Sequence, residues 1–289
     1  MKYVNKLFSS FVLIAAVVLS HTAMAAQPEP WGIDLQQAAT PSMGHLRDFH
    51  EMTLWIITGI VIFVTALLAF VMIRFNERAN PTPSKTTHHV MLEVVWTIVP
   101  VLILIVIVVP SMKLLYYTDR TEKPEMTLKV TGYQWYWGYE YPDQGGIAFQ
   151  SNMVPEKDLK EGQVRLLSTD NPVVIPVDTN IQVMTTAADV IHSFAVPAFG
   201  VKKDAVPGRA NETWIRVTKP GIYYGQCSEI CGTGHAFMPI EIKAVTKDEF
   251  TAWVAAKKKE QGIADSAPVS APTPEEGVKA EDPSAAHKS

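Results

Sequence analysis

Cysteine is nearly absent from the sequence. The chain contains two cysteines among 289 residues, too few for a disulfide-rich scaffold. No Cys-x-x-Cys-His motif occurs, which excludes a covalently attached haem. The formal net charge is only −4, and no basic patch of the kind that binds nucleic acid is present. The sequence also lacks internal repeats.

The N-terminus has the pattern of a secretory signal peptide over residues 1–25. Lys2 and Lys6 form a positive start, residues 11–19 form an apolar core, and Ala23-Met24-Ala25 is a small-residue cleavage site. A first membrane helix is the alternative, but this apolar core is too short to span a bilayer. The sequence therefore predicts that residues 26–51, a polar and loosely structured segment, lie on the outer side of a membrane.

Two long apolar runs follow, and each has roughly the length that a bilayer demands. They cover residues 52–73 and 91–112, so residues 52–112 are predicted to form a transmembrane hairpin. The connecting loop, residues 74–89, carries more basic than acidic residues and is expected in the cytoplasm; its charged residues are Arg74, Glu77, Arg78 and Lys85.

Beyond the second run the hydrophobic period changes to two, which is typical of β-strands. Short strands between turn residues indicate a sandwich or a barrel over residues 113–258. Thr246 and Glu249 form a capping box that opens a last helix, ending near Lys258. Residues 259–289 are poor in large apolar side chains and are expected to be disordered. The predicted strands are residues 126–132, 134–141, 164–168, 173–177, 181–185, 213–217, 222–225 and 238–245.

Both cysteines lie in one glycine-rich loop that also carries other soft donors. Cys227 and Cys231 are followed by His235 and Met238, and thiolate, imidazole and thioether donors favour copper or zinc over calcium or magnesium. Zinc rarely takes thioether sulfur. A disulfide is the plainer alternative outside the cytosol, but it gives no reason for the histidine and the methionine.

A further histidine, His192, lies in the apolar, strand-like run of residues 189–197. A lone histidine in such a run is more often a hydrogen-bonded core residue. In blue-copper proteins, however, a distant histidine on one strand joins a ligand loop between the last two strands. His192 is therefore the candidate for the second histidine ligand.

The loop and the His192 run resemble the dinuclear copper (CuA) motif of cytochrome c oxidase subunit 2. The resemblance extends from the first membrane span to about Lys258. It implies a cupredoxin-like Greek-key β-barrel after the transmembrane hairpin. It also implies two copper ions bridged by the cysteine thiolates and completed by two histidines, a methionine and a backbone carbonyl. The implied ligands are His192, Cys227, Glu229 (through its carbonyl), Cys231, His235 and Met238. The Glu229 side chain is implied to reach a magnesium ion at the boundary with subunit 1.

Two further residues have roles implied by the same resemblance. Trp135 lies in the aromatic run of residues 133–141 and matches the tryptophan at which electrons arrive from cytochrome c, although such a run is also ordinary core. Glu93 matches a glutamate at the entrance of a proton path into subunit 1. Its alternative role is to complement the helix dipole in a first turn.

The implied assembly is an oxidase in the bacterial inner membrane with its copper domain in the periplasm. Electrons would pass from cytochrome c through this chain to haem a, haem a3 and CuB of subunit 1, beside subunit 3. Oxygen reduction to water would be coupled to proton translocation. Because cytochrome c is basic, an acidic rim is expected to steer it; the candidates are Glu140, Asp143, Asp170 and Asp189.

Three other classes compete with this interpretation. A quinol oxidase subunit 2 shares the topology but lacks the ligand set. A nitrous oxide reductase shares the loop but needs a large histidine-rich domain, for which 8 histidines are too few. A membrane-tethered mononuclear copper carrier needs one cysteine, so Cys231 argues against it.

Overall fold

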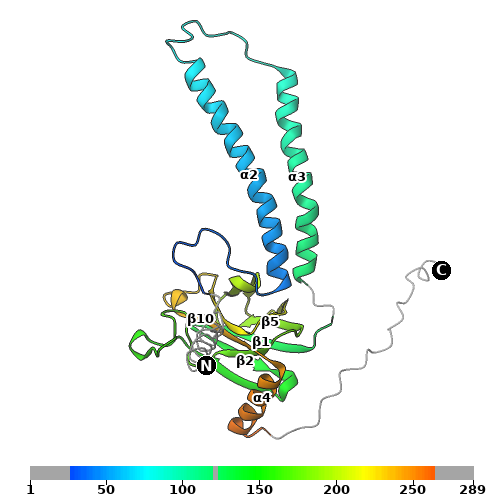
Figure 1. The fold of residues 1–289 in the computed structure, drawn as a ribbon, viewed down its shortest axis with the longest axis vertical. Coiled ribbons are helices and arrows are strands. Elements are labelled where there is room, and N and C mark those ends of the chain that lie inside the picture. Colours follow the sequence, from blue (N-terminus) through cyan, green and yellow to red (C-terminus); the bar gives the residue numbers. More distant parts are fainter. Residues whose placement is uncertain (1–26, 120–122, 264–289) are drawn as a thin grey trace, which may run out of the picture.

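The computed structural model describes residues 27–119 and 123–263. Within them, two long helices lie side by side and project from a β domain, and a shorter helix packs on the far side of that domain (Figure 1). The predicted signal peptide, residues 1–25, lies outside the described residues, and so does most of the predicted tail. The fold class is confirmed: a helical hairpin precedes an all-β domain.

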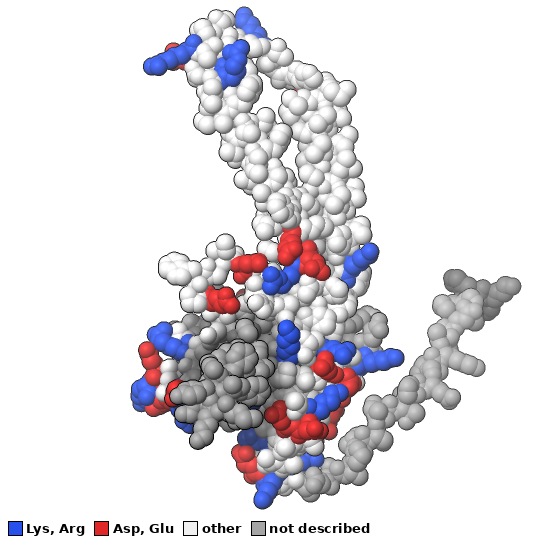
Figure 2. All heavy atoms as spheres, viewed as in Figure 1, with Lys and Arg blue, Asp and Glu red and all other residues white. Residues whose placement is uncertain are grey.

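Helices α2 (Pro41–Arg74) and α3 (Val90–Asp119) contain the two predicted spans. Both are long and apolar enough to cross a membrane, and their apolar side chains are largely exposed in the isolated chain. Figure 2 shows long uncharged flanks on both helices, with Lys and Arg gathered at the connecting loop. This distribution is the one that a lipid-facing hairpin requires.

The prediction that residues 26–51 are loosely structured is wrong for residues 41–51, which are the first turns of α2. Thr40 is the N-cap, and its Oγ1 accepts a hydrogen bond from the Met43 N–H at 3.1 Å. Pro41 occupies the first turn, where its missing N–H costs nothing. Hydropathy detects only the part of a helix that lipid would cover. The predicted span therefore begins at residue 52, later than the helix itself.

The hairpin is fixed to the β domain at the end opposite its connecting loop. Thr40 Oγ1 donates to the Phe199 carbonyl at 2.7 Å. The Trp214 indole donates to the Tyr117 carbonyl at 2.8 Å, and Lys203 pairs with Asp119 at 3.2 Å. Both helices thus contact the domain through polar groups.

The β domain consists of two five-stranded sheets, ordered β3-β2-β1-β5-β8 and β4-β10-β9-β6-β7. Alternate side chains of each strand point into the space between the sheets, and this space holds the buried apolar core. The β1–β5 and β4–β10 pairs are parallel, and the other pairs are antiparallel. The strands are β1 (Met126–Tyr133), β2 (Tyr136–Tyr141), β3 (Ile147–Ser151), β4 (Val173–Pro176), β5 (Ile181–Ala187), β6 (His192–Val196), β7 (Val201–Ala205), β8 (Asn211–Ile215), β9 (Gly221–Cys227) and β10 (Pro239–Val245).

The predicted strand 164–168 is wrong, because these residues form a turn. Leu166 has a left-handed φ of 64°, and the Val164 N–H donates to Ser168 Oγ at 2.9 Å. Strands β3 and β7 were not predicted. The predicted strand 134–141 begins only at Tyr136, since residues 134 and 135 form the two-residue turn of the β1–β2 hairpin.

The predicted C-terminal helix is confirmed as α4 (Lys247–Gln261), together with the capping box of Thr246 and Glu249. It ends slightly beyond Lys258, at Gly262 in a left-handed conformation.

Glu241, in β10, is a buried carboxyl group with 7% of its surface exposed. It accepts a short hydrogen bond of 2.6 Å from the Thr169 N–H. Burial raises the pKa of Glu241 above its usual range, and the hydrogen bonds from Thr169 only partly offset this. The carboxylate therefore ties the 152–170 segment to the second sheet at an electrostatic cost.

We expect Glu241 to make the β domain less stable as the pH rises through its pKa. The unfolded chain ionises Glu241 at the ordinary, lower pKa, so it releases the proton first and stability falls with rising pH. Glu241→Gln should remove this component, so the free energy of unfolding of this variant should fall less as the pH rises above the ordinary pKa of a glutamate. Denaturant unfolding followed by near-ultraviolet circular dichroism checks it. Exposed Glu212 provides the control Glu212→Gln, and an equal pH dependence in both variants would contradict the expectation.

Candidate metal centre

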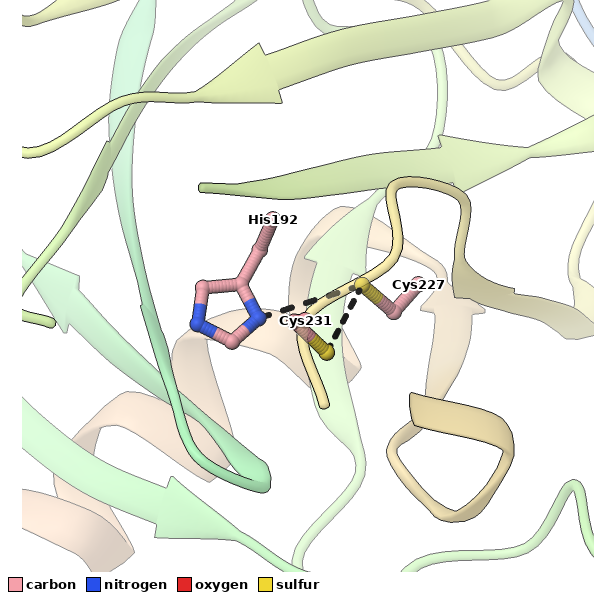
Figure 3. A group of neighbouring side chains, drawn as sticks. All are labelled: His192, Cys227 and Cys231. Atoms are coloured by element: carbon pink, nitrogen blue, oxygen red, sulfur yellow. Dashed lines mark hydrogen bonds between the residues drawn. The ribbon is translucent and has the colours of Figure 1, made fainter. Parts of the chain in front are cut away.

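Strand pairing brings the loop donors and His192 to one end of the second sheet. Cys227 is the last residue of β9, and the antiparallel pairing of β9 with β10 closes the loop that carries Cys231. Strand β6 pairs with β9 so that Phe194 lies opposite Cys227, which places His192, two residues before, beside the loop. Figure 3 shows the His192 ring and the two cysteine side chains pointing toward one another.

The donor atoms converge at distances suited to a shared metal site. The two Sγ atoms are 3.8 Å apart. His192 Nδ1 lies 3.9 Å from Cys227 Sγ, and His235 Nδ1 lies 3.6 Å from Cys231 Sγ. Met238 Sδ is 3.5 Å from Cys231 Sγ, and the Glu229 carbonyl oxygen is 3.3 Å from Cys227 Sγ. The structure thus brings all six predicted ligands together.

Both cysteines are free thiols in the structure, and their separation is well beyond the roughly 2.05 Å of a disulfide. Cys227, Cys231, His192 and Met238 are all buried. Burial, reinforced by the neighbouring Cys227, raises the pKa of Cys231 to about 12. A raised pKa keeps the Cys231 thiol protonated until a cation compensates the charge of the thiolate, so metal binding there must release a proton. The soft donor set fits copper.

His192 is both a buried histidine and a preoriented donor. Its Nε2 lies 2.9 Å from Asp189 Oδ1, while Nδ1 faces the sulfur. A carboxylate on one ring nitrogen fixes the tautomer that leaves the other free to bind metal. The core interpretation of His192 and the ligand interpretation are therefore compatible.

The four acids predicted to form a docking rim all have partners within the protein. Asp189 also accepts hydrogen bonds from the N–H groups of Val190 and Gln134. Burial alone would raise the pKa of Asp189, but these hydrogen bonds and the contact with His192 outweigh burial. The pKa of Asp189 is therefore lowered. Glu140 pairs with Lys129, and the other two accept backbone N–H bonds. Asp143 accepts a hydrogen bond from the Thr127 N–H, and Asp170 accepts one from the Asn152 N–H.

Trp135 lies directly against the ligand loop. Its indole Nε1 donates to the Cys231 carbonyl at 3.1 Å, and 36% of its surface remains exposed. A Cβ on Gly234 would overlap the Trp135 ring, so the glycine allows this close stacking. Trp135 thus connects the surface with the metal centre.

Sequence reasoning missed the side chains that support the donors. Buried Trp137 donates to the Met238 carbonyl at 3.2 Å and packs edge-on against His192. Gln134 donates from its side chain to the Cys231 carbonyl at 2.8 Å. Their position in the aromatic run next to Trp135 was the available signal.

Glu93 is not part of this centre. It lies in the first turn of α3, at the far end of the hairpin (Figure 1). Its Oε1 lies 3.4 Å from the His89 N–H, which is the geometry of a helix N-terminal acid. The dipole role fits this contact, and the proton-path role stays a prediction.

Two family models match the chain. One, described as cytochrome c oxidase subunit II, periplasmic domain, matches residues 126–245. The other, described as cytochrome c oxidase subunit II, transmembrane domain, matches residues 28–114. A probable cytochrome c oxidase subunit 2 of Rickettsia bellii is 50% identical over 247 residues, which are 86% of this chain and 92% of that protein. The chain belongs to the cytochrome c oxidase subunit 2 family.

Other similar proteins carry the same name. Cytochrome c oxidase subunit 2 of Oenothera berteroana is 48% identical over 239 residues, covering 81% of this chain and 93% of that one. The crystal structure of the periplasmic domain of subunit II of cytochrome oxidase from Bradyrhizobium japonicum has 52% sequence identity and a TM-score of 0.46, and covers 50% of this chain and all of that one. As a member of this family, the chain is a subunit of a haem–copper oxidase, with two transmembrane helices and a periplasmic domain whose Cys/His/Met cluster is consistent with a copper site.

Proposed function

We propose that this subunit accepts electrons one at a time from cytochrome c at a dinuclear copper centre and passes them to haem a of subunit 1. The observation that carries the proposal is the convergence of two free thiols, two imidazoles, a thioether and a carbonyl within 3.3–3.9 Å contacts. Two cysteines exceed what a mononuclear site needs, and every other donor lies near one of them.

Each donor residue would have a distinct role in holding the metal. Cys227 and Cys231 would bridge the two copper ions as thiolates, and His192 and His235 would each supply one nitrogen. Met238 and the Glu229 carbonyl complete the set, the methionine as a weak donor that tunes the potential. Bound copper supplies one-electron redox chemistry. The buried, hydrogen-bonded donors limit reorganisation when the charge changes.

Electrons would reach the centre through Trp135, whose ring is partly exposed and donates a hydrogen bond to the Cys231 carbonyl. Exposed apolar side chains beside the centre, Ile191, Ile230 and Phe237, support contact with other proteins. The partners we infer are cytochrome c, subunit 1 with haem a, haem a3 and CuB, and subunit 3. Oxygen reduction to water and the coupled proton translocation would take place in that complex.

Two acidic side chains have proposed roles outside the copper pair. The exposed Glu229 side chain offers hard oxygen to a magnesium ion at the boundary with subunit 1. Glu93, at the cytoplasmic end of α3, would open a proton path. The basic loop 74–89 supports a bacterial inner membrane location with the copper domain in the periplasm. We also infer that residues 1–25 are removed as a signal peptide.

Copper content and an electron paramagnetic resonance spectrum test the proposal. The oxidase complex should contain two copper ions per chain in this subunit, with a hyperfine pattern from one electron shared by two copper nuclei. A single copper with an unshared electron would indicate a mononuclear carrier. A disulfide between Cys227 and Cys231, in native protein that holds no metal, would overturn the proposal.

A further inference from the structure

The turn between β1 and β2 contacts both segments that carry metal donors. Strands β1 and β2 belong to the first sheet, whereas β6 and β9 belong to the second. At the end of β1, a Cβ on Gly132 would lie 2.7 Å from His192 Cδ2, so the hairpin approaches the ligand ring closely. The turn therefore spans the two sheets at the metal centre.

Gln134 makes the decisive contacts of this turn. Its backbone N–H donates to Asp189 Oδ2 at 2.7 Å, and the other oxygen of that carboxylate lies 2.9 Å from His192 Nε2. Its side-chain Nε2 donates to the Cys231 carbonyl at 2.8 Å. One residue is thus linked to His192 through its main chain and Asp189, and to Cys231 through its side chain.

The Cys231 carbonyl receives two N–H donors, because the Trp135 indole also donates to it at 3.1 Å. Two donors orient this peptide group and with it the Cys231 side chain. The positive ends of both N–H dipoles also point toward the thiolate-bearing residue, and such dipoles favour the state with more negative charge. Loss of a donor should therefore favour the oxidised centre.

We propose that Gln134 is a positioning residue that fixes Cys231 relative to His192 and raises the reduction potential of the copper centre. This inference rests on the proposed function, because it concerns the same centre. The role is distinct from that of Trp135, which would carry electrons. Gln134 acts only through the Cys231 carbonyl and the Asp189 carboxylate.

The test compares Gln134→Met and Gln134→Glu in the full oxidase complex. Methionine keeps the length of the side chain but removes the N–H donor, and glutamate adds a negative charge that repels the carbonyl. The midpoint potential is followed through the near-infrared band of the copper pair, and the hyperfine pattern through its paramagnetic spectrum. Gln150→Glu, on the exposed face of β3, introduces the same charge away from the centre.

We expect Gln134→Met to shift the balance between reduced and oxidised centre about threefold toward oxidised, and Gln134→Glu about tenfold, which is about 59 mV for one electron. The hyperfine pattern should change in both, and Gln150→Glu should match the wild type. If Gln134→Met keeps the wild-type potential and spectrum, or if Gln150→Glu shifts the potential as far as Gln134→Glu, the inference is overturned.

Two further outcomes separate this inference from the proposed function. If the wild-type complex lacks the copper pair, the proposed function itself fails. If a Gln134 variant assembles without copper, competition with a chelator at increasing copper concentration measures its affinity. A loss relative to Gln150→Glu supports the positioning role, whereas equal affinity of all variants counts against it.

Discussion

Replacement of Cys231 by serine is expected to remove the copper pair. Cys231 Sγ is the hub of the centre, with Cys227 Sγ, His235 Nδ1 and Met238 Sδ all within 3.8 Å. Serine is close to cysteine in size, so the loop should fold, but its hard hydroxyl cannot bridge soft metal ions. Mutation of a residue that hydrogen-bonds to a metal ligand lowers metal affinity roughly 10–100-fold, and loss of the ligand itself should lower it further. Copper analysis should find at most one ion in the subunit, without the near-infrared band.

Ser228→Ala is the control for this substitution. Ser228 lies between the two cysteines in sequence, and its contact with the body of the domain is a backbone N–H bond to the Ser193 carbonyl at 3.0 Å. Removal of its hydroxyl should therefore leave both copper ions and electron transfer unchanged. A Cys231→Ser variant that still binds two copper ions would show that Cys231 is not a bridging ligand, and would weaken the dinuclear assignment itself.

The donor set was predictable because most of it is local. Cys227, Cys231, His235 and Met238 follow one another in a single loop, so their convergence needs only a tight turn. His192 stood out because an imidazole in an apolar strand-like run needs a partner. The two-sheet domain followed from the period of two in the hydrophobic pattern.

The supporting contacts were not predictable from local patterns. Gln134 reaches Asp189 across 55 positions and the Cys231 carbonyl across 97, and these contacts depend on how two sheets pack. For the same reason Asp189 was predicted as a surface acid, although it supports His192. The turn at 164–168 was missed because apolar residues at alternate positions suggested a strand, whereas Leu166 adopts a left-handed backbone.

Gly225→Ala is expected to disrupt both the fold around the centre and its metal binding. Gly225 lies in β9, where this strand passes against β6. A Cβ at this position would overlap the Ala195 carbonyl oxygen and lie 3.0 Å from Val196 Cγ2. The overlapped atom belongs to the backbone, so no side-chain rotation can relieve it. Strand β6 would have to move away from β9, and His192 would move away from Cys227 with it.

The expected cost is about 3 kcal/mol or more, at the upper end of what overpacking produces. Denaturant unfolding of the β domain measures it, and copper content of the purified chain should fall in parallel. Gly44→Ala in α2 is the matched control, because no atom lies within 4 Å of its added Cβ and alanine favours a helix. If Gly225→Ala binds copper and unfolds like Gly44→Ala, then β6 and β9 need not touch at this point. The position of His192 would then be set by Asp189 and the β1–β2 turn alone.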